Sequence, residues 1–222
     1  EVVGMREDEA SELVRQESRR LGIEALINDD KIGEIYEYTD GHPYAMRIIL
    51  GEMAITGKWI PINSIISRKS EMLNALFERS FNKLSTNGRW VFLVVSGWRQ
   101  QVSELPLLIS LSQKGIDAEL GIEECIKLSL ISQHVTCDGQ YSYSVPELAR
   151  VFARKKMESE PDRLEIRETV QIIIEFGRSS SEIADSEDND RMIHSYFYKA
   201  KQRVLEGTVD GSRFADEFLL PI

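Results

Sequence analysis

The stretch TDGHPYAMRIILGEMA, residues 39 to 54, contains the predicted end of one helix and the predicted start of another. Gly41 readily adopts the left-handed conformation that ends a helix. Pro43 suits the first position of a new helix, because its φ is fixed and an N–H at that position has no partner within the helix. The sequence therefore predicts a rigid Gly-His-Pro corner, followed by a helix whose buried face carries Ala45, Ile48, Ile49 and Met53.

Composition limits the classes of protein to which the chain can belong. The chain has 222 residues and a net charge of −10, and its length allows one large domain or two to three small ones. Its hydrophobic content of 42% is enough for ordinary cores. No apolar run reaches the roughly 18 residues of a membrane span, and the first residues are too acidic for a signal peptide. The two cysteines, Cys125 and Cys137, support neither a disulfide framework nor a zinc site. We expect a cytoplasmic protein with no metal site and no membrane partner.

Two helices are predicted before the corner. The first runs from Glu7 to Leu21 and ends at Gly22, and the second begins after Asn28 and is closed by Gly41. The helix after Pro43 is expected to end near Gly57, and residues 58 to 67 are expected to form a link or one short helix. The opening EVVGM resembles the tail of a buried strand, which predicts that the chain continues a larger domain upstream.

The remainder is predicted to hold further helices and one hairpin. Helical patterns cover residues 73–84, 85–98, 105–115 and 119–130, and two β-like runs then flank Asp138-Gly139, a strong hairpin-turn signal. Pro146 can open a closing helix. Residues 160–177 predict another helix, residues 179–190 an acidic, Ser-rich loop, and a last helix begins at Asp190. We expect a mainly α fold with three parts: residues 1–67, residues 68–157 and a helical arm over residues 158–222, which could begin a solenoid.

This order resembles the C-terminal half of the nucleotide-binding module of the STAND family, the signal-transducing ATPases related to the NB-ARC and AP-ATPase proteins. The resemblance covers roughly residues 1 to 157 and implies a helical lid followed by a winged-helix domain. It also implies that Pro43 packs near the adenine of ADP or ATP, with Gly41, His42 and Tyr44 beside it as nucleotide-binding positions. The nucleotide, with Mg²⁺, would be bound only together with an upstream phosphate-loop domain.

The chain departs from the family at the position that senses ADP. Many STAND proteins read Met-His-Asp before an apolar helix of the winged-helix domain, and the His contacts the β-phosphate. The corresponding positions here are Val145, Pro146 and Glu147. A proline cannot make the imidazole contact, so at Pro146 and Glu147 the ADP lock is absent, looser or supplied by another residue.

The sequence contains no catalytic motif. It has no G-x-x-x-x-G-K-[ST] phosphate loop, no H-E-x-x-H and no cysteine beside a plausible base. We therefore expect that this chain alone does not hydrolyse ATP, although its parent protein would be a slow ATPase. The resemblance implies three kinds of partner: the chain's own upstream nucleotide-binding domain, further copies after activation, and proteins bound by the C-terminal helical arm.

Two other functions stay open. A winged-helix DNA-binding regulator needs a basic recognition helix, whereas residues 117–129, DAELGIEECIKLS, are acidic, so nucleic acid is an improbable partner unless Arg150, Arg154, Lys155 and Lys156 form one stripe. A helical protein-interaction scaffold with no nucleotide is the other alternative, because the corner motif is short.

Overall fold

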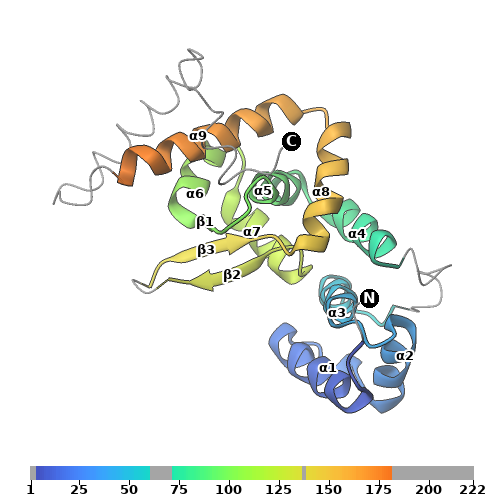
Figure 1. The fold of residues 1–222 in the computed structure, drawn as a ribbon. Coiled ribbons are helices and arrows are strands. Elements are labelled where there is room, and N and C mark those ends of the chain that lie inside the picture. Colours follow the sequence, from blue (N-terminus) through green and yellow to red (C-terminus); the bar gives the residue numbers. More distant parts are fainter. Residues whose placement is uncertain (1–3, 61–71, 137–138, 182–222) are drawn as a thin grey trace. The chain divides into compact units, whose positions relative to one another are not determined.

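The computed structural model describes residues 4–60, 72–136 and 139–181, with side chains as far as Phe176. These residues form nine α-helices, one short 3-10 helix and a three-stranded antiparallel sheet (Figure 1). The predicted mainly α fold with a small β-hairpin is therefore confirmed at this level. No helix of the described part of the chain is long and apolar enough to cross a membrane.

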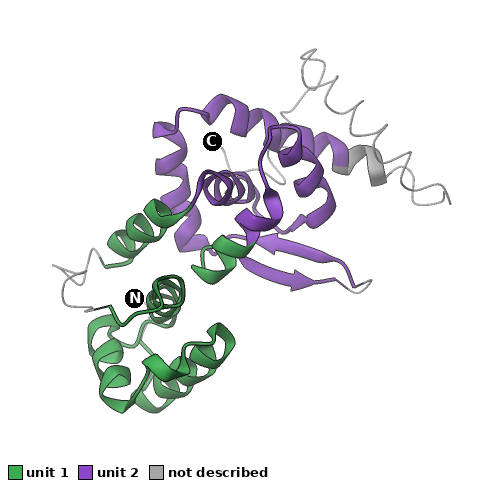
Figure 2. Ribbon diagram, turned by 180° about the vertical axis from the view of Figure 1, so that it is seen from behind, with its two compact units in different colours: residues 1–84, 123–130 green, residues 85–122, 131–222 purple. Residues whose placement is uncertain are grey.

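The chain divides into two compact units (Figure 2). Unit 1 comprises residues 1–84 and 123–130, and unit 2 comprises residues 85–122 and 131–222. The predicted domain boundary after residue 67 lies outside the described residues, as do residues 61–67 of the predicted link.

Unit 1 is organised around one buried helix. Its α-helices are α1 (Glu7–Leu21), α2 (Asp29–Thr39), α3 (Pro43–Thr56) and α4 (Met72–Lys83), and the 3-10 helix η1 (Glu24–Leu26) joins α1 to α2. Helix α3 packs against α1, α2 and α4. Because it is contacted on several sides, its residues from Ala45 to Met53 are buried except for Arg47.

The ends of these helices follow from local chemistry. Gly22 ends α1 with φ 68°, and the Asn28 side chain accepts a hydrogen bond from Lys31 N at 3.0 Å at the start of α2. The sequence prediction was wrong in one detail, because the left-handed residue that caps α2 is Asp40, with φ 52°. Gly41 then adds a second left-handed residue, with φ 69°. The corner therefore needs two consecutive residues with positive φ.

Unit 2 is built on α5 (Thr86–Ser96), and Ser85 is the N-cap of this helix. The other helices are α6 (Glu104–Ser112), α7 (Ala118–Lys127), α8 (Glu147–Ser159) and α9 (Arg163–Ser181), and the last five residues of α7 belong to unit 1. Both α8 and α9 pack on α5, and α9 also packs on α6. Residues Trp90 to Ser96 of α5 are all buried.

The sheet has the strand order β1-β3-β2, formed by β1 (Val102–Ser103), β2 (Ser132–Val135) and β3 (Tyr141–Ser144). Both neighbours of β3 are antiparallel to it, and Tyr143 pairs with Val102 on one side and Gln133 on the other. The predicted hairpin is confirmed, with Gly139 at φ 79°. Strand β1 was not predicted, because two residues are too few for an alternating pattern.

Helix α9 continues to Ser181, so the prediction of a loop from residue 179 was wrong for residues 179–181. The rest of that predicted acidic loop, the predicted helix from Asp190 and the possible solenoid lie outside the described residues.

Candidate functional site

The Gly-His-Pro corner lies at the start of α3 and has a structural explanation at each residue. Pro43 is the first residue of the helix, and His42 is its N-cap, with Nδ1 accepting a hydrogen bond from Ala45 N at 3.4 Å. Both His42 and Pro43 are partly exposed. The corner is therefore fixed in position by its own backbone while the Pro43 ring remains partly accessible.

Gly41 is required by a close contact with the chain that enters unit 1. Met5 N donates a hydrogen bond to Gly41 O at 2.8 Å. A Cβ on Gly41 would lie 2.5 Å from Met5 O, and a Cβ on Gly4 would lie 2.0 Å from Asp40 O. Both distances are too short for real side chains, so only glycine permits this contact. The segment at Gly4 and Met5 therefore runs directly against the corner.

Tyr44 differs from the rest of the corner because its hydroxyl points into the protein. Its ring lies 5.6 Å from the Phe77 ring of α4, measured between centroids. The hydroxyl is buried and has no hydrogen-bond partner among the described residues, and burial raises the pKa of Tyr44 above its usual value. In this arrangement Tyr44 contributes packing between α3 and α4.

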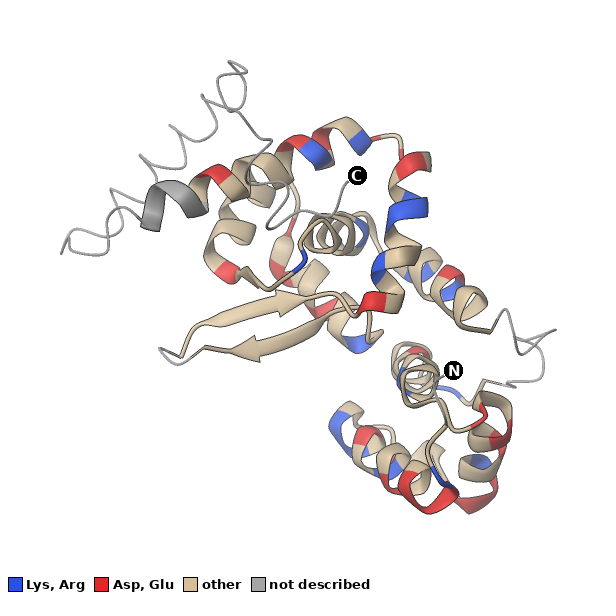
Figure 3. Ribbon diagram, in the orientation of Figure 1, with Lys and Arg blue, Asp and Glu red and all other residues tan. Residues whose placement is uncertain are grey.

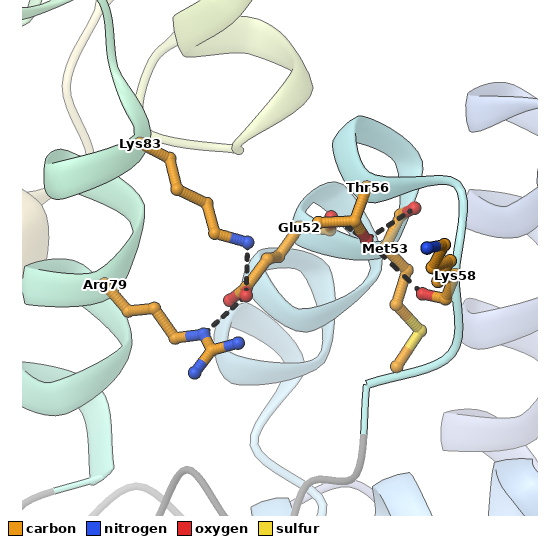
Figure 4. Close-up of polar contacts among 6 residues, drawn as sticks. All are labelled: Glu52, Met53, Thr56, Lys58, Arg79 and Lys83. Carbon is orange, nitrogen blue, oxygen red and sulfur yellow. Dashed lines mark hydrogen bonds and ion pairs between the residues drawn. The ribbon is translucent and has the colours of Figure 1, made fainter.

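Further along the same interface lies a buried ionic group, the Glu52 cluster, made of Glu52, Arg79 and Lys83 (Figure 4). Glu52 belongs to α3 and its side chain is fully buried, whereas Arg79 and Lys83 come from adjacent turns of α4. Oε1 of Glu52 accepts hydrogen bonds from Arg79 Nε and from Lys83 Nζ, the latter at 2.5 Å. The cluster therefore joins α3 to α4 by charge-assisted bonds.

The two oxygens of Glu52 are in different situations. Oε1 has two cationic donors, but Oε2 is buried and has no hydrogen-bond partner in the described part of the chain. A carboxylate taken out of water is costly unless its charge is compensated. The side chains of Arg79 and Lys83 keep 39% and 24% of their surface exposed, so they compensate Glu52 while remaining partly hydrated.

Sequence reasoning missed the Glu52 cluster. One signal was present: Glu52 follows Ile48 by four residues and Ile49 by three, so it falls on the predicted apolar face of its helix. An acidic residue on such a face requires a partner. The sequence does not identify Arg79 and Lys83 as that partner, because they lie 27 and 31 residues away.

The other predicted site positions belong to unit 2. Pro146 is the N-cap of α8, and the Glu147 carboxylate accepts a hydrogen bond from Arg150 Nη1 at 3.0 Å. Arg150 Nη2 also donates to Val145 O at 2.8 Å, and its side chain is only 9% exposed. Glu147 is therefore engaged in fixing the start of α8.

The described residues form no metal centre, and unit 1 contains a small cavity. They contain no group of three or more His, Cys, Asp or Glu side chains that could hold a metal ion. A cavity of about 120 Å³ in unit 1, lined by Arg15, Ser18, Arg19, Glu24 and Ile27, is smaller than the roughly 300 Å³ of ordinary ligand sites. A comparison with protein-family models and a comparison with curated proteins both give no match.

Proposed function

We propose that this chain is the regulatory part of a STAND-type switch driven by ATP and ADP. In this proposal unit 1 provides a helical lid over a nucleotide, and unit 2 provides a winged helix whose position depends on the nucleotide. The lid closes over ADP in an inactive state, and exchange for ATP permits oligomerisation and signalling. The bound nucleotide would then shift the equilibrium between the inactive and the active state, because its contacts with the protein differ between these two states.

The observation that carries the proposal is the contact of Gly4 and Met5 with the corner. Because Met5 N donates to Gly41 O, a domain joined upstream of Gly4 would begin within a few residues of Pro43. The partly exposed Pro43 ring offers that domain a rigid apolar surface on which an adenine could pack.

The order of elements in unit 2 supports the winged-helix assignment. Helix α5 is followed by β1, by the helices α6 and α7, and by the hairpin β2–β3, and β1 pairs with β3. A helix-strand-helix-helix-hairpin order with a three-stranded sheet is typical of winged helices. Pro146 stands where the family has a phosphate-sensing His, and the carboxylate of the adjacent Glu147 is already bonded to Arg150. We therefore expect ADP to be held less tightly than in proteins with that His.

Two observations argue against DNA binding by this winged helix. The exposed side chains of α7 and the residue before it include Asp117, Glu119 and Glu123, and Lys127 is paired with Glu123 at 2.6 Å. Arg150 is buried and bonded to the backbone, so it does not join Arg154 and Lys155 in an exposed stripe. A face of this charge repels phosphate.

The experiment uses the protein extended upstream to include its phosphate-binding domain. After purification, bound nucleotide is released by denaturation and identified by chromatography. The proposal predicts co-purified ADP or ATP, and less of it in a Pro43→Ala variant than in a Pro161→Ala control, because Pro161 is an exposed residue before α9. An extended protein without nucleotide would refute the proposal and favour the interaction scaffold.

A further inference from the structure

Strand β2 lies at an edge of the sheet. The strand order β1-β3-β2 leaves β2 paired on one side with β3, and no other described strand pairs with it. An edge strand presents a row of backbone donors and acceptors that another strand can use. The question is which groups of β2 face outward and what could pair with them.

The hairpin geometry identifies the outward groups. Thr136 N donates to Gln140 O at 2.8 Å, which makes residues 136 and 140 a hydrogen-bonded pair. Hydrogen-bonded and non-bonded pairs alternate along an antiparallel ladder. The pair of His134 with Ser142 is therefore hydrogen-bonded, whereas Gln133 and Val135, opposite Tyr143 and Tyr141, direct their N–H and C=O groups away from β3.

The described residues of this edge lack the charged and proline residues that often prevent strand pairing. Natural edge strands are protected by Lys, Pro, inward-pointing charges or bulges. The described residues of the hairpin, 131–136 and 139–145, contain no Lys, Arg, Asp, Glu or Pro, and Figure 3 shows both strands without charged residues. The cross-strand neighbours Val135 and Tyr141 are 68% and 44% exposed, so an apolar pair lies beside the unprotected edge.

We propose that the β2 edge is a self-association surface, in which β2 of one chain pairs antiparallel with β2 of a second copy. A two-fold axis at His134 places Gln133 opposite Val135 of the second copy, and Val135 opposite its Gln133. In each of these two pairs the backbone groups of both residues face the other strand, so the two residues form both N–H···O bonds with each other. The two His134 residues then form the non-bonded pair between them. The strand is self-complementary in this register, as a two-fold interface requires.

Charge makes the hairpin the favoured place for contact between two copies of this chain. Each copy carries a net charge of −10, so most of their surfaces repel each other, but the described residues of the hairpin carry no Lys, Arg, Asp or Glu. The interface is small, and we expect weak association, with a dissociation constant of ~100 µM. This inference does not depend on the nucleotide proposal, because it requires only the hairpin.

The first test is sedimentation velocity of the chain over a concentration series that reaches about 0.5 mM, several times the expected dissociation constant. Two matched variants are compared: Val135→Lys at the edge, and Leu164→Lys on α9, where the exposed leucine gives the same change of charge at a distant position. The Val135→Lys change should weaken dimerisation roughly tenfold, and Leu164→Lys should leave it within about twofold. A chain that stays monomeric throughout, or two variants that weaken association equally, would overturn the proposal.

Amide hydrogen exchange provides a second readout that separates self-pairing from pairing with another protein. The amides of Gln133 and Val135 should exchange rapidly in dilute chain and become protected as the concentration rises. The His134 amide, already bonded within the hairpin, should be protected at both concentrations. Protection at 133 and 135 that does not change with concentration would contradict the second copy as the occupant of this edge.

Discussion

Removing the anion of the Glu52 cluster and removing its two cations should lower the stability of the protein by different amounts. One variant replaces the anion, Glu52→Met, and another replaces both cations, Arg79→Met with Lys83→Met. The two perturbations remove the same ionic contacts between α3 and α4. They differ in what they leave behind, because Glu52 is fully buried whereas the two cations are partly exposed.

The magnitudes follow from that difference. The double variant leaves an uncompensated carboxylate inside unit 1, which should lower the free energy of unfolding by about 3–5 kcal/mol. Glu52→Met leaves two cations that can hydrate through their exposed surface, and methionine fills the volume of the acid. Its effect should lie between a loss of about 1 kcal/mol and a slight gain. Either cation replaced singly should cost about 1–3 kcal/mol, because the other still compensates Oε1.

Urea unfolding at pH 7, followed by circular dichroism, measures these differences in the whole chain. Peptide-level hydrogen exchange of α3 and α4 then assigns the change to unit 1. The reasoning is refuted if Glu52→Met destabilises the protein as much as the double variant does, since desolvation of Glu52 would then not be the dominant cost.

Three further predictions concern single positions. Gly41→Ala should destabilise unit 1 by about 2 kcal/mol more than Gly22→Ala, because both residues have a positive φ but only Gly41 lies against Met5. Urea unfolding measures both variants, and equal losses in the free energy of unfolding would mean that the Met5 contact is unimportant. Burial raises the pKa of Tyr44, and burial with a hydrogen bond to Glu104 raises that of Tyr143, so both should remain protonated when ordinary tyrosines ionise near pH 10. The stability that these two raised pKa values contribute is present below about pH 10 and is lost as the pH rises further. In absorbance titrations, the rise from tyrosine ionisation in Tyr44→Phe and in Tyr143→Phe should match that of the parent chain up to about pH 11. A smaller absorbance rise in either variant would contradict this. Arg150→Met should lower the free energy of unfolding by about 1–3 kcal/mol, because it loses its bonds to Val145 O and Glu147. The control Arg154→Met, at an exposed position, should change the free energy of unfolding by no more than about 0.5 kcal/mol. Equal changes in the two variants would show that the Arg150 bonds do not stabilise α8.

Local chemistry was sufficient to predict much of the helical structure. The start of α3 at Pro43 and the end of α1 before Gly22 agree with the prediction, because proline and glycine act within one or two residues of their own position. The cap of α2 was displaced by one residue, because Asp40 tolerates a left-handed conformation that the sequence analysis assigned only to glycine.

Features that depend on residues far apart in the sequence were not predicted. Strand β1 exists because Val102 pairs with Tyr143, and two residues carry no pattern of their own. The contact of Gly41 with Met5 and the bonds of Glu52 to α4 likewise depend on tertiary packing. The nucleotide-binding roles of Gly41, His42, Pro43 and Tyr44 remain predictions from resemblance, and the orientation of Tyr44 toward Phe77 gives that residue a packing role.

The most direct test of the switch proposal is the affinity of the upstream-extended protein for ADP. Equilibrium binding is measured for the parent, for Pro43→Ala and for the Pro161→Ala control. Alanine is tolerated at the first position of a helix, so Pro43→Ala should leave the fold intact while removing apolar surface at the corner. The account predicts that ADP binding weakens roughly tenfold in Pro43→Ala and is unchanged in Pro161→Ala. Equal affinity in all three proteins would contradict a role for the corner in nucleotide binding.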